Sequence, residues 1–252
     1  MSFAVPAEAY DRFMGVHSRQ LAPQLVDLAR LSSGDRALDV GCGPGVLTAE
    51  LVARLGAGSV AAVDPSESFV AAARARSPGV DVRRASAEAL PFADRAFDAA
   101  LAQLVVHFMT DPVAGLREMA RVTRREGVVA ACVWDHAGER SPIAVFWRAA
   151  RDLGLGTQDE SALAGVREGH LVELFKTSGL RNVEDGVLGA RVAYSSFDGW
   201  WEPFAFGVGP AGNVFLGLSP DQRARLRERC QKLLPPAPFE VVSFAWAARG
   251  IV

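Results

Sequence analysis

The chain has 252 residues, half of them apolar, and a formal net charge of −2. This length can bury one substantial core, and the near-neutral charge without a concentrated basic block argues against nucleic acid as a partner. The three cysteines lie far apart and form no CxxC pair, so they indicate neither a disulfide framework nor a zinc knuckle. Without a signal-like start or an apolar run long enough for a bilayer, we expect a cytoplasmic protein that does not contact membranes.

The first half of the chain alternates short apolar runs with helix-like segments. Residues 36–41, 59–64, 80–85, 97–106 and 127–134 read as strands, and residues 46–56, 66–76 and 111–123 read as helices. Apolar strands separated by helices predict parallel strands that are buried on both faces. The expected fold class is α/β, with a doubly wound, mostly parallel, seven-stranded Rossmann-like sheet.

The pattern changes after about residue 140. Residues 141–154 and 170–180 read as helices, and residues 187–196 and 239–251 read as long strands that we expect to form an antiparallel C-terminal edge. The insertion at 197–234 is aromatic and Gly-rich, then becomes a charged helix. We therefore expect three parts: N-terminal cap helices (1–30), a core that holds the parallel strands (31–140), and the remainder of the sheet (141–252), whose lid insertion at about 197–234 supplies a pocket over the strand ends.

The stretch ALDVGCGPGVLT at 37–48 is the first functional signal. Gly41, Gly43 and Gly45 follow the first strand and open the first helix, the place where doubly wound sheets bind ligands. Val46 stands where a dinucleotide fingerprint requires glycine, and no Lys-Ser or Lys-Thr pair follows, which argues against a P-loop. Asp64 ends the second strand, where an acid can accept both hydroxyls of a ribose. Together these residues predict a nucleoside-containing ligand.

Five successive motifs carry a family resemblance: ALDVGCGPG, AAVDPSESFVAAARA, ASAEALPF, FDAALAQLVVHFMTDPVAGLREMARV and GVVAACVW. In this order and at these separations they resemble class I S-adenosylmethionine-dependent methyltransferases of the small-molecule type related to ubiquinone and menaquinone biosynthesis enzymes. The likeness covers about residues 36–134. The segment YDRFMGVHSRQLAP resembles the part of such proteins that caps the cofactor.

The resemblance implies S-adenosyl-L-methionine as cofactor and assigns it a set of contacts. The glycines, with Cys42 as a small filler in their turn, would let the backbone approach the aminoacyl part. Ser86 stands where family members usually carry an acid that accepts a hydrogen bond from the adenine amino group. The remaining implied contacts are Asp39 to the ammonium group directly or through water, Asp64 to the ribose, Pro65 and Ser66 beside the adenine, Ala87 and Glu88 in the ASAEALPF motif, and Gln103, Leu104 and Val105 at the methionine moiety. Tyr10 and Arg19 either close over the site, with Arg19 pairing with the cofactor carboxylate, or belong to a surface helix.

Methyl transfer from a sulfonium is an in-line displacement, so a base is needed only if the acceptor must lose a proton. His107 is the first candidate and His136 the second, with packing and solvated roles as the alternatives. The aromatic residues of the insertion can line the acceptor pocket or form the core of the lid; these are Trp200, Trp201, Phe204 and Phe206. Methyltransferases that act on catechols bind magnesium through several oxygen ligands near the ends of the fourth and fifth strands. Only Asp135 and Gln103 stand at the corresponding positions here, so we expect no metal.

The expected function is methyl transfer to a small-molecule acceptor, by a monomer or homodimer. No N-P-P-Y-like stretch follows the fourth strand, so methylation of DNA bases is not supported. Two alternatives stay open: a non-catalytic S-adenosylmethionine-binding protein and, less favoured by Val46 and the motif order, a nicotinamide-dependent oxidoreductase. The acceptor and the atom that is methylated are not indicated by any pattern.

Overall fold

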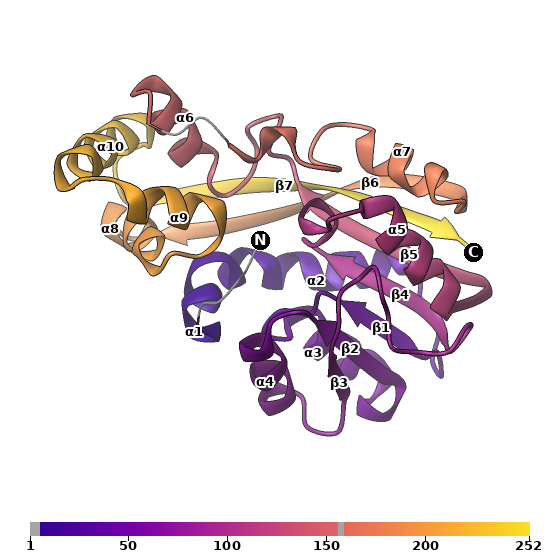
Figure 1. Cartoon of the computed structure of the whole chain (residues 1–252). Coiled ribbons are helices and arrows are strands. Elements are labelled where there is room, and N and C mark those ends of the chain that lie inside the picture. Colours follow the sequence, from indigo (N-terminus) through magenta and orange to yellow (C-terminus); the bar gives the residue numbers. More distant parts are fainter. Residues whose placement is uncertain (1–5, 156–158) are drawn as a thin grey trace.

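The computed structural model describes residues 6–155 and 159–252, and a seven-stranded sheet forms its centre (Figure 1). The strand order is β3-β2-β1-β4-β5-β7-β6, and β7 is antiparallel to both of its neighbours. The predicted doubly wound, mostly parallel sheet with an antiparallel C-terminal edge is therefore confirmed. The strands are β1 Ala37–Val40, β2 Val60–Asp64, β3 Asp81–Arg84, β4 Phe97–Gln103, β5 Thr123–Trp134, β6 Arg181–Tyr194 and β7 Phe239–Ile251.

Helices cover both faces of the sheet because the central strands are apolar on both sides. Successive residues of β1 point to opposite faces: Ala37 lies in the apolar cluster that contains Leu25 and Leu51, whereas Leu38 lies in the cluster that contains Leu116. The first face is covered by α2 Val16–Ala29, α3 Val46–Leu55 and α4 Glu67–Arg76, and the second by α5 Pro112–Val122 and α7 His170–Thr177.

Three predicted strands differ from the structure by three residues or more at one end, while the others differ by at most one residue at either end. Strand β4 ends at Gln103 instead of continuing to 106, because Leu104 adopts a left-handed conformation (φ 62°) and a 3-10 turn, η3 Val106–Phe108, follows. Strand β5 begins four residues before the predicted start, and its register against β4 shifts between Phe97 and Ala99. Strand β6 begins at Arg181 rather than at residue 187. The sequence does not indicate this earlier start, because the first half of this edge strand is largely exposed and carries no apolar run.

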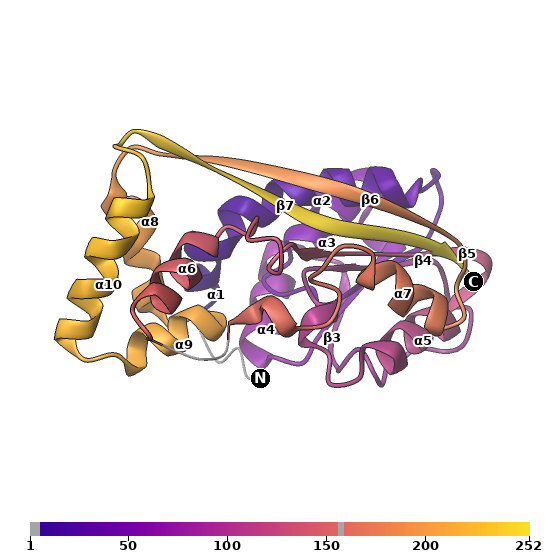
Figure 2. The ribbon, with the colours of Figure 1, turned by 90° about the horizontal axis from the view of Figure 1, so that it is seen from above.

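A second, smaller core lies beyond the sheet, where β6 and β7 extend past the other strands (Figure 2). Phe204 stacks on Phe146 with ring centroids 4.5 Å apart and meets Phe13 of the N-terminal segment edge-on at 5.0 Å. The elements around this second core are α1 Ala7–Tyr10, the short π-helix η1 Asp11–Gly15, α6 Ala144–Asp152, η4 Glu160–Ala162, α8 Phe197–Trp201, η5 Glu202–Phe206, α9 Gly209–Gly217 and α10 Pro220–Leu233. One more short element, the 3-10 turn η2 Ala57–Ser59, lies elsewhere, directly before β2.

Local sequence signals account for several helix starts. The Asp111 side chain accepts a hydrogen bond from the Ala114 amide at 3.0 Å, and Pro112 occupies the first turn of α5, as the sequence predicts. Ser219 and Gln222 form a reciprocal capping box at the start of α10. Across the described ranges 6–155 and 159–252, the helices are all too short or too polar to span a membrane.

Candidate active site

The glycine loop lies at the carboxyl end of β1 and is tied to β2. The amides of Gly41 and Cys42 both donate to the Val63 carbonyl, at 2.8 and 2.9 Å, and the Gly43 amide donates to Asp64 Oδ2 at 2.9 Å. Gly41, Gly43 and Gly45 have φ values of 70°, 53° and 92°, a region that favours glycine. The loop thereby turns the chain from β1 into α3 and leaves backbone at its surface.

The first two glycines have different reasons to lack a side chain. A Cβ at Gly41 would lie 2.5 Å from a methyl carbon of Val105, so this position is filled by a neighbouring side chain. A Cβ at Gly43 would meet no atom within 4 Å, because Gly43 lies on the wall of a large cavity. Close approach of a ligand to the backbone therefore concerns Gly43, while Gly41 serves the packing of the loop.

A cavity of about 900 Å³ opens at the carboxyl ends of β1, β2 and β4. This is large for a small-molecule site, since such pockets commonly span roughly 300 to 1,000 Å³. Most of the cofactor-binding residues predicted from the sequence line it, namely Tyr10, Gly41, Gly43, Asp64, Pro65, Ser66, Ser86, Ala87, Glu88, Gln103, Leu104 and Val105. Four others do not: Arg19, Asp39, Cys42 and Gly45.

Asp64 fixes the glycine loop and the start of α4 through hydrogen bonds. Its Oδ2 accepts from the Gly43 amide, and its Oδ1 accepts from the Ser66 amide at 2.8 Å, at the start of α4. Burial raises the pKa of this carboxyl, and the two backbone donors act against that rise. A carboxylate oxygen can accept more than one hydrogen bond, so both oxygens retain capacity toward the cavity.

Asp39 lies beneath the loop and is fully buried. Its Oδ2 accepts from Thr48 Oγ1 at 2.6 Å, whereas its Oδ1 has no hydrogen-bond partner. Burial raises the pKa of Asp39 to about 7. The side chain is therefore a buried acid that a nearby cation would ionise.

Polar residues at the tips of β3 and β4 are partly engaged within the protein. Glu88 Oε1 accepts from the Thr110 amide at 2.7 Å and fixes the segment before α5. Gln103 Nε2 donates to the Ser18 carbonyl at 3.1 Å, while its Oε1 is buried without a partner. An unsatisfied acceptor at a cavity wall is available to a ligand that can donate.

The N-terminal segment closes one side of the cavity. The ring of Tyr10 meets Phe69 of α4 edge-on, with centroids 5.5 Å apart, and Asp11 forms an ion pair with Arg76 of the same helix. Burial raises the pKa of the Tyr10 hydroxyl, so it stays protonated. Arg19 lies outside the cavity, exposed, with its guanidinium 3.9 Å from Asp11.

A second cavity of about 40 Å³ adjoins the first, and Tyr10, Leu104 and Phe108 line both. The sequence candidates His107 and His136 line this smaller cavity, together with Glu160. Burial lowers the pKa of both histidines, that of His136 to about 4, and raises the pKa of Glu160 to about 7. Glu160 was not predicted, since nothing in the spacing of its neighbours along the chain distinguishes it from a surface acid.

The aromatic residues of the insertion belong to the core of the lid in this structure. Trp200, Trp201 and Phe204 are buried in the small second core, and Phe206 packs against it. Neither the large nor the small cavity includes any of them among its lining residues. The segment that follows, residues 208–211, lines the smaller cavity instead.

Part of the chain is similar to known methyltransferases. Residues 38–131 match the family model described as "Methyltransferase domain". A demethylmenaquinone methyltransferase of Mycobacterium sp. (strain KMS) is 44% identical over 104 residues, which are 40% of this chain and 43% of that protein. A ubiquinone biosynthesis O-methyltransferase of Rhizobium johnstonii is 35% identical over 158 residues, 60% of this chain and 62% of that protein. The aligned part thus spans less than two thirds of either relative.

The fold also occurs among solved structures. That of geranyl diphosphate C-methyltransferase from Streptomyces coelicolor, in complex with Mg²⁺, geranyl diphosphate and S-adenosyl-L-homocysteine, aligns with a TM-score of 0.55 at 13% identity. The alignment covers 92% of this chain and 78% of that one. At this identity the likeness concerns the fold alone.

Proposed function

Because residues 38–131 form a class I methyltransferase domain, we propose that the protein transfers the methyl group of S-adenosylmethionine to a small-molecule acceptor. One observation carries the proposal: a cavity of about 900 Å³ at the carboxyl ends of β1, β2 and β4 is lined by the glycine loop and by Asp64. A nucleoside-containing ligand fits these features, since the loop offers bare backbone and the carboxylate can accept from ribose hydroxyls.

In the proposed complex the donor lies across the strand tips. Asp64 accepts from the ribose hydroxyls with the oxygens that already hold the glycine loop, and Ser86 with the Ala87 amide faces the adenine. The methionine moiety lies along Gln103 to Val105, where Gln103 Oε1 offers an unused acceptor to its ammonium group. Asp39 contributes its charge from beneath the loop, not by contact, because it does not line the cavity.

Methyl transfer then requires alignment and exclusion of water. The acceptor nucleophile attacks the methyl carbon in line with the carbon–sulfur bond, and the bonding pair leaves with sulfur as S-adenosylhomocysteine. Tyr10, Leu104 and Phe108 stand between the two cavities, so the methyl group would be presented near this boundary. An acceptor that loses a proton would pass it toward His107 or His136, which are uncharged at neutral pH.

Calorimetric titration tests the donor site directly. We expect S-adenosylmethionine and S-adenosylhomocysteine to bind with one site per chain, and NADH not to bind. Incubation with methyl-labelled donor and a library of small metabolites then tests turnover, with label transferred to an extractable product as the expected result. Folded protein that binds neither compound would overturn the proposal, and donor binding without transfer to any acceptor would support a non-catalytic binding protein instead.

A further inference from the structure

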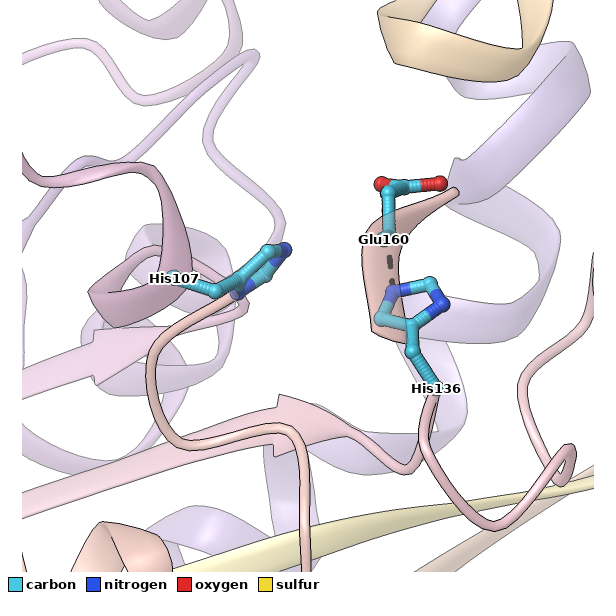
Figure 3. A group of neighbouring side chains, drawn as sticks. All are labelled: His107, His136 and Glu160. Carbon is cyan, nitrogen blue, oxygen red and sulfur yellow. Dashed lines mark ion pairs between the residues drawn. The ribbon is translucent and has the colours of Figure 1, made fainter. Parts of the chain in front are cut away.

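Three side chains that donor binding does not use meet at the smaller cavity (Figure 3). His107 comes from η3, His136 from the loop after β5, and Glu160 from η4. One nitrogen or oxygen atom of each lies within 4.8 Å of those of the other two, and His136 Nε2 is 3.9 Å from Glu160 Oε1. All three residues are buried, so the fold brings together three potential ligands from distant parts of the chain.

The cluster lacks positive charge. Glu160 Oε2 accepts from Trp147 Nε1 at 2.9 Å, which fixes the carboxyl group and leaves Oε1 facing His136. Among the described residues that line the cavity there is no Lys or Arg. A buried carboxyl group beside two uncharged imidazoles is costly to ionise, and a bound cation would remove that cost.

The histidines also have unused nitrogen atoms. Nδ1 of His107 and Nδ1 of His136 are buried and have no hydrogen-bond partner. A neutral imidazole carries its one lone pair on either ring nitrogen, and no hydrogen bond from a described residue to Nδ1 fixes which one, so Nε2 of His136, which faces Glu160 Oε1, can offer that lone pair to an ion. The cavity of about 40 Å³ has room for an ion with a water molecule, but not for an organic metabolite.

We propose that His107, His136 and Glu160 bind a divalent first-row transition-metal ion of the zinc or cobalt type. Two imidazoles and one carboxylate suit these ions, whereas magnesium and calcium prefer oxygen ligands. The expectation that the protein binds no metal rested on oxygen ligands at the strand ends and did not include Glu160. Ligand atoms about 2.1 Å from such an ion lie roughly 3 to 3.5 Å apart, so the side chains close up by roughly 1 to 1.5 Å on binding.

No hydrogen bond to Nδ1 from the described part of the chain opposes this movement in either imidazole, while the Trp147 indole holds the carboxylate as a fixed point. The remaining coordination positions face the cavity that shares Tyr10, Leu104 and Phe108 with the proposed donor site. If the proposed function holds, an acceptor oxygen could complete the coordination there, and the ion would then lower the pKa of that acceptor, because a coordinated imidazole has no lone pair left to take its proton. Binding of the ion itself does not depend on it.

The experiment uses the full chain without an affinity tag, stripped with a chelator and dialysed against Zn²⁺, Co²⁺ or Mg²⁺. We expect elemental analysis to find about one Zn²⁺ or Co²⁺ per chain and no retained Mg²⁺. Bound Co²⁺ should give visible absorption bands of nitrogen and oxygen ligation. Absence of retained Zn²⁺ and Co²⁺, or equal retention of Mg²⁺, overturns the proposal.

Variants locate the site. Glu160→Gln keeps a side-chain acceptor for the Trp147 indole and should fold, yet weaken Co²⁺ binding on the order of 100-fold, as should His136→Ala. The matched controls are Glu168→Gln, an exposed acid, and His170→Ala, which lies outside the cluster; both should bind Co²⁺ as the parent does. Thermal melts establish that each variant is folded, and unchanged Co²⁺ binding by Glu160→Gln overturns the assignment.

A parallel titration with S-adenosylhomocysteine separates the two proposals. Donor binding without Zn²⁺ or Co²⁺ binding overturns the metal site and leaves the proposed function in place. Metal binding without donor binding overturns the proposed function and leaves the metal site in place.

Discussion

The carboxylate of Asp64 accepts hydrogen bonds from Gly43 and Ser66 and, in the proposed complex, from the ribose as well. Asp64→Ala removes the charged acceptor and loosens the loop. We expect the dissociation constant for S-adenosylhomocysteine, measured by calorimetry, to rise roughly 5- to 150-fold, which corresponds to about 1 to 3 kcal/mol for hydrogen bonds to a charged group.

The control for this variant is Glu67→Ala, which removes an exposed carboxylate from the wall of the same cavity. Its dissociation constant should stay within about twofold of the parent value, because exposed charges contribute little. An Asp64→Ala protein that melts normally and binds the ligand unchanged would show that the ribose lies elsewhere.

Asp39 gives the proposed site a pH dependence. Because burial raises the pKa of Asp39 to about 7, the unbound protein carries a protonated carboxyl group here below that pH. A donor with an ammonium and a sulfonium group favours the carboxylate, so binding releases a proton at low pH and affinity rises as the pH increases toward about 7. Calorimetry at about pH 6 in two buffers of different ionisation enthalpy measures the released proton.

The variant Asp39→Asn cannot release that proton. Its binding enthalpy should be independent of the ionisation enthalpy of the buffer, and its affinity should be lower than that of the parent above about pH 7. A parent protein whose affinity is the same at about pH 5.5 and about pH 7.5 would mean that Asp39 does not sense the bound donor.

Within the loop between β1 and α3, we expect Gly41 to serve the packing of the loop and Gly43 to serve ligand binding. Gly41→Ala places a methyl group against Val105 at a positive φ, and such overpacking should lower the free energy of urea unfolding by about 1 to 3 kcal/mol. Gly43→Ala meets open space, so its cost in unfolding free energy should be about 1 kcal/mol from the left-handed backbone. Because Gly43 lines the large cavity, the added methyl group should nevertheless weaken binding of the proposed donor at least about tenfold.

The double variant Gly41→Ala/Val105→Ala tests whether contact with Val105 is the reason that Gly41→Ala destabilises the protein. Removing the two methyl groups of Val105 should restore part of the stability lost in Gly41→Ala, because the two sites are in contact. Strictly additive losses would mean that the backbone conformation, and not Val105, requires glycine at this position.

These elements also show what the sequence could and could not predict. The glycine loop, Asp64 and the five parallel strands follow from local patterns, because turns with positive φ and strands buried on both faces leave clear signals. The end of β4 does not follow from such a pattern, because Leu104, Val105 and Val106 are apolar like the strand, although the chain already turns at Leu104 into a left-handed conformation. Glu160 was missed for another reason: its burial depends on α6 and the Trp147 indole, which no spacing along the chain reveals.

In the whole molecule, the N-terminal segment joins the two cores. Tyr10 packs on Phe69 at the larger cavity, and Phe13, only three residues later, packs on Phe204 in the second core. Figure 1 shows α1 lying between α4 and the helices of the lid. A ligand held under Tyr10 therefore contacts a segment that both cores share, and its binding should stabilise the fold as a unit.

Ligand-dependent melting measures this coupling. At a concentration of about 100 times its dissociation constant, S-adenosylhomocysteine adds about 2.7 kcal/mol to the unfolding free energy, which for a chain of this size raises the Tm by roughly 5 to 10 °C. Asp64→Ala at the same ligand concentration should show a smaller rise. NADH should produce none, since Val46 replaces the glycine that a dinucleotide loop requires. A rise in Tm with NADH and none with S-adenosylhomocysteine would indicate a nicotinamide-binding site on this sheet instead, because only a ligand that binds the folded state can shift the transition upward.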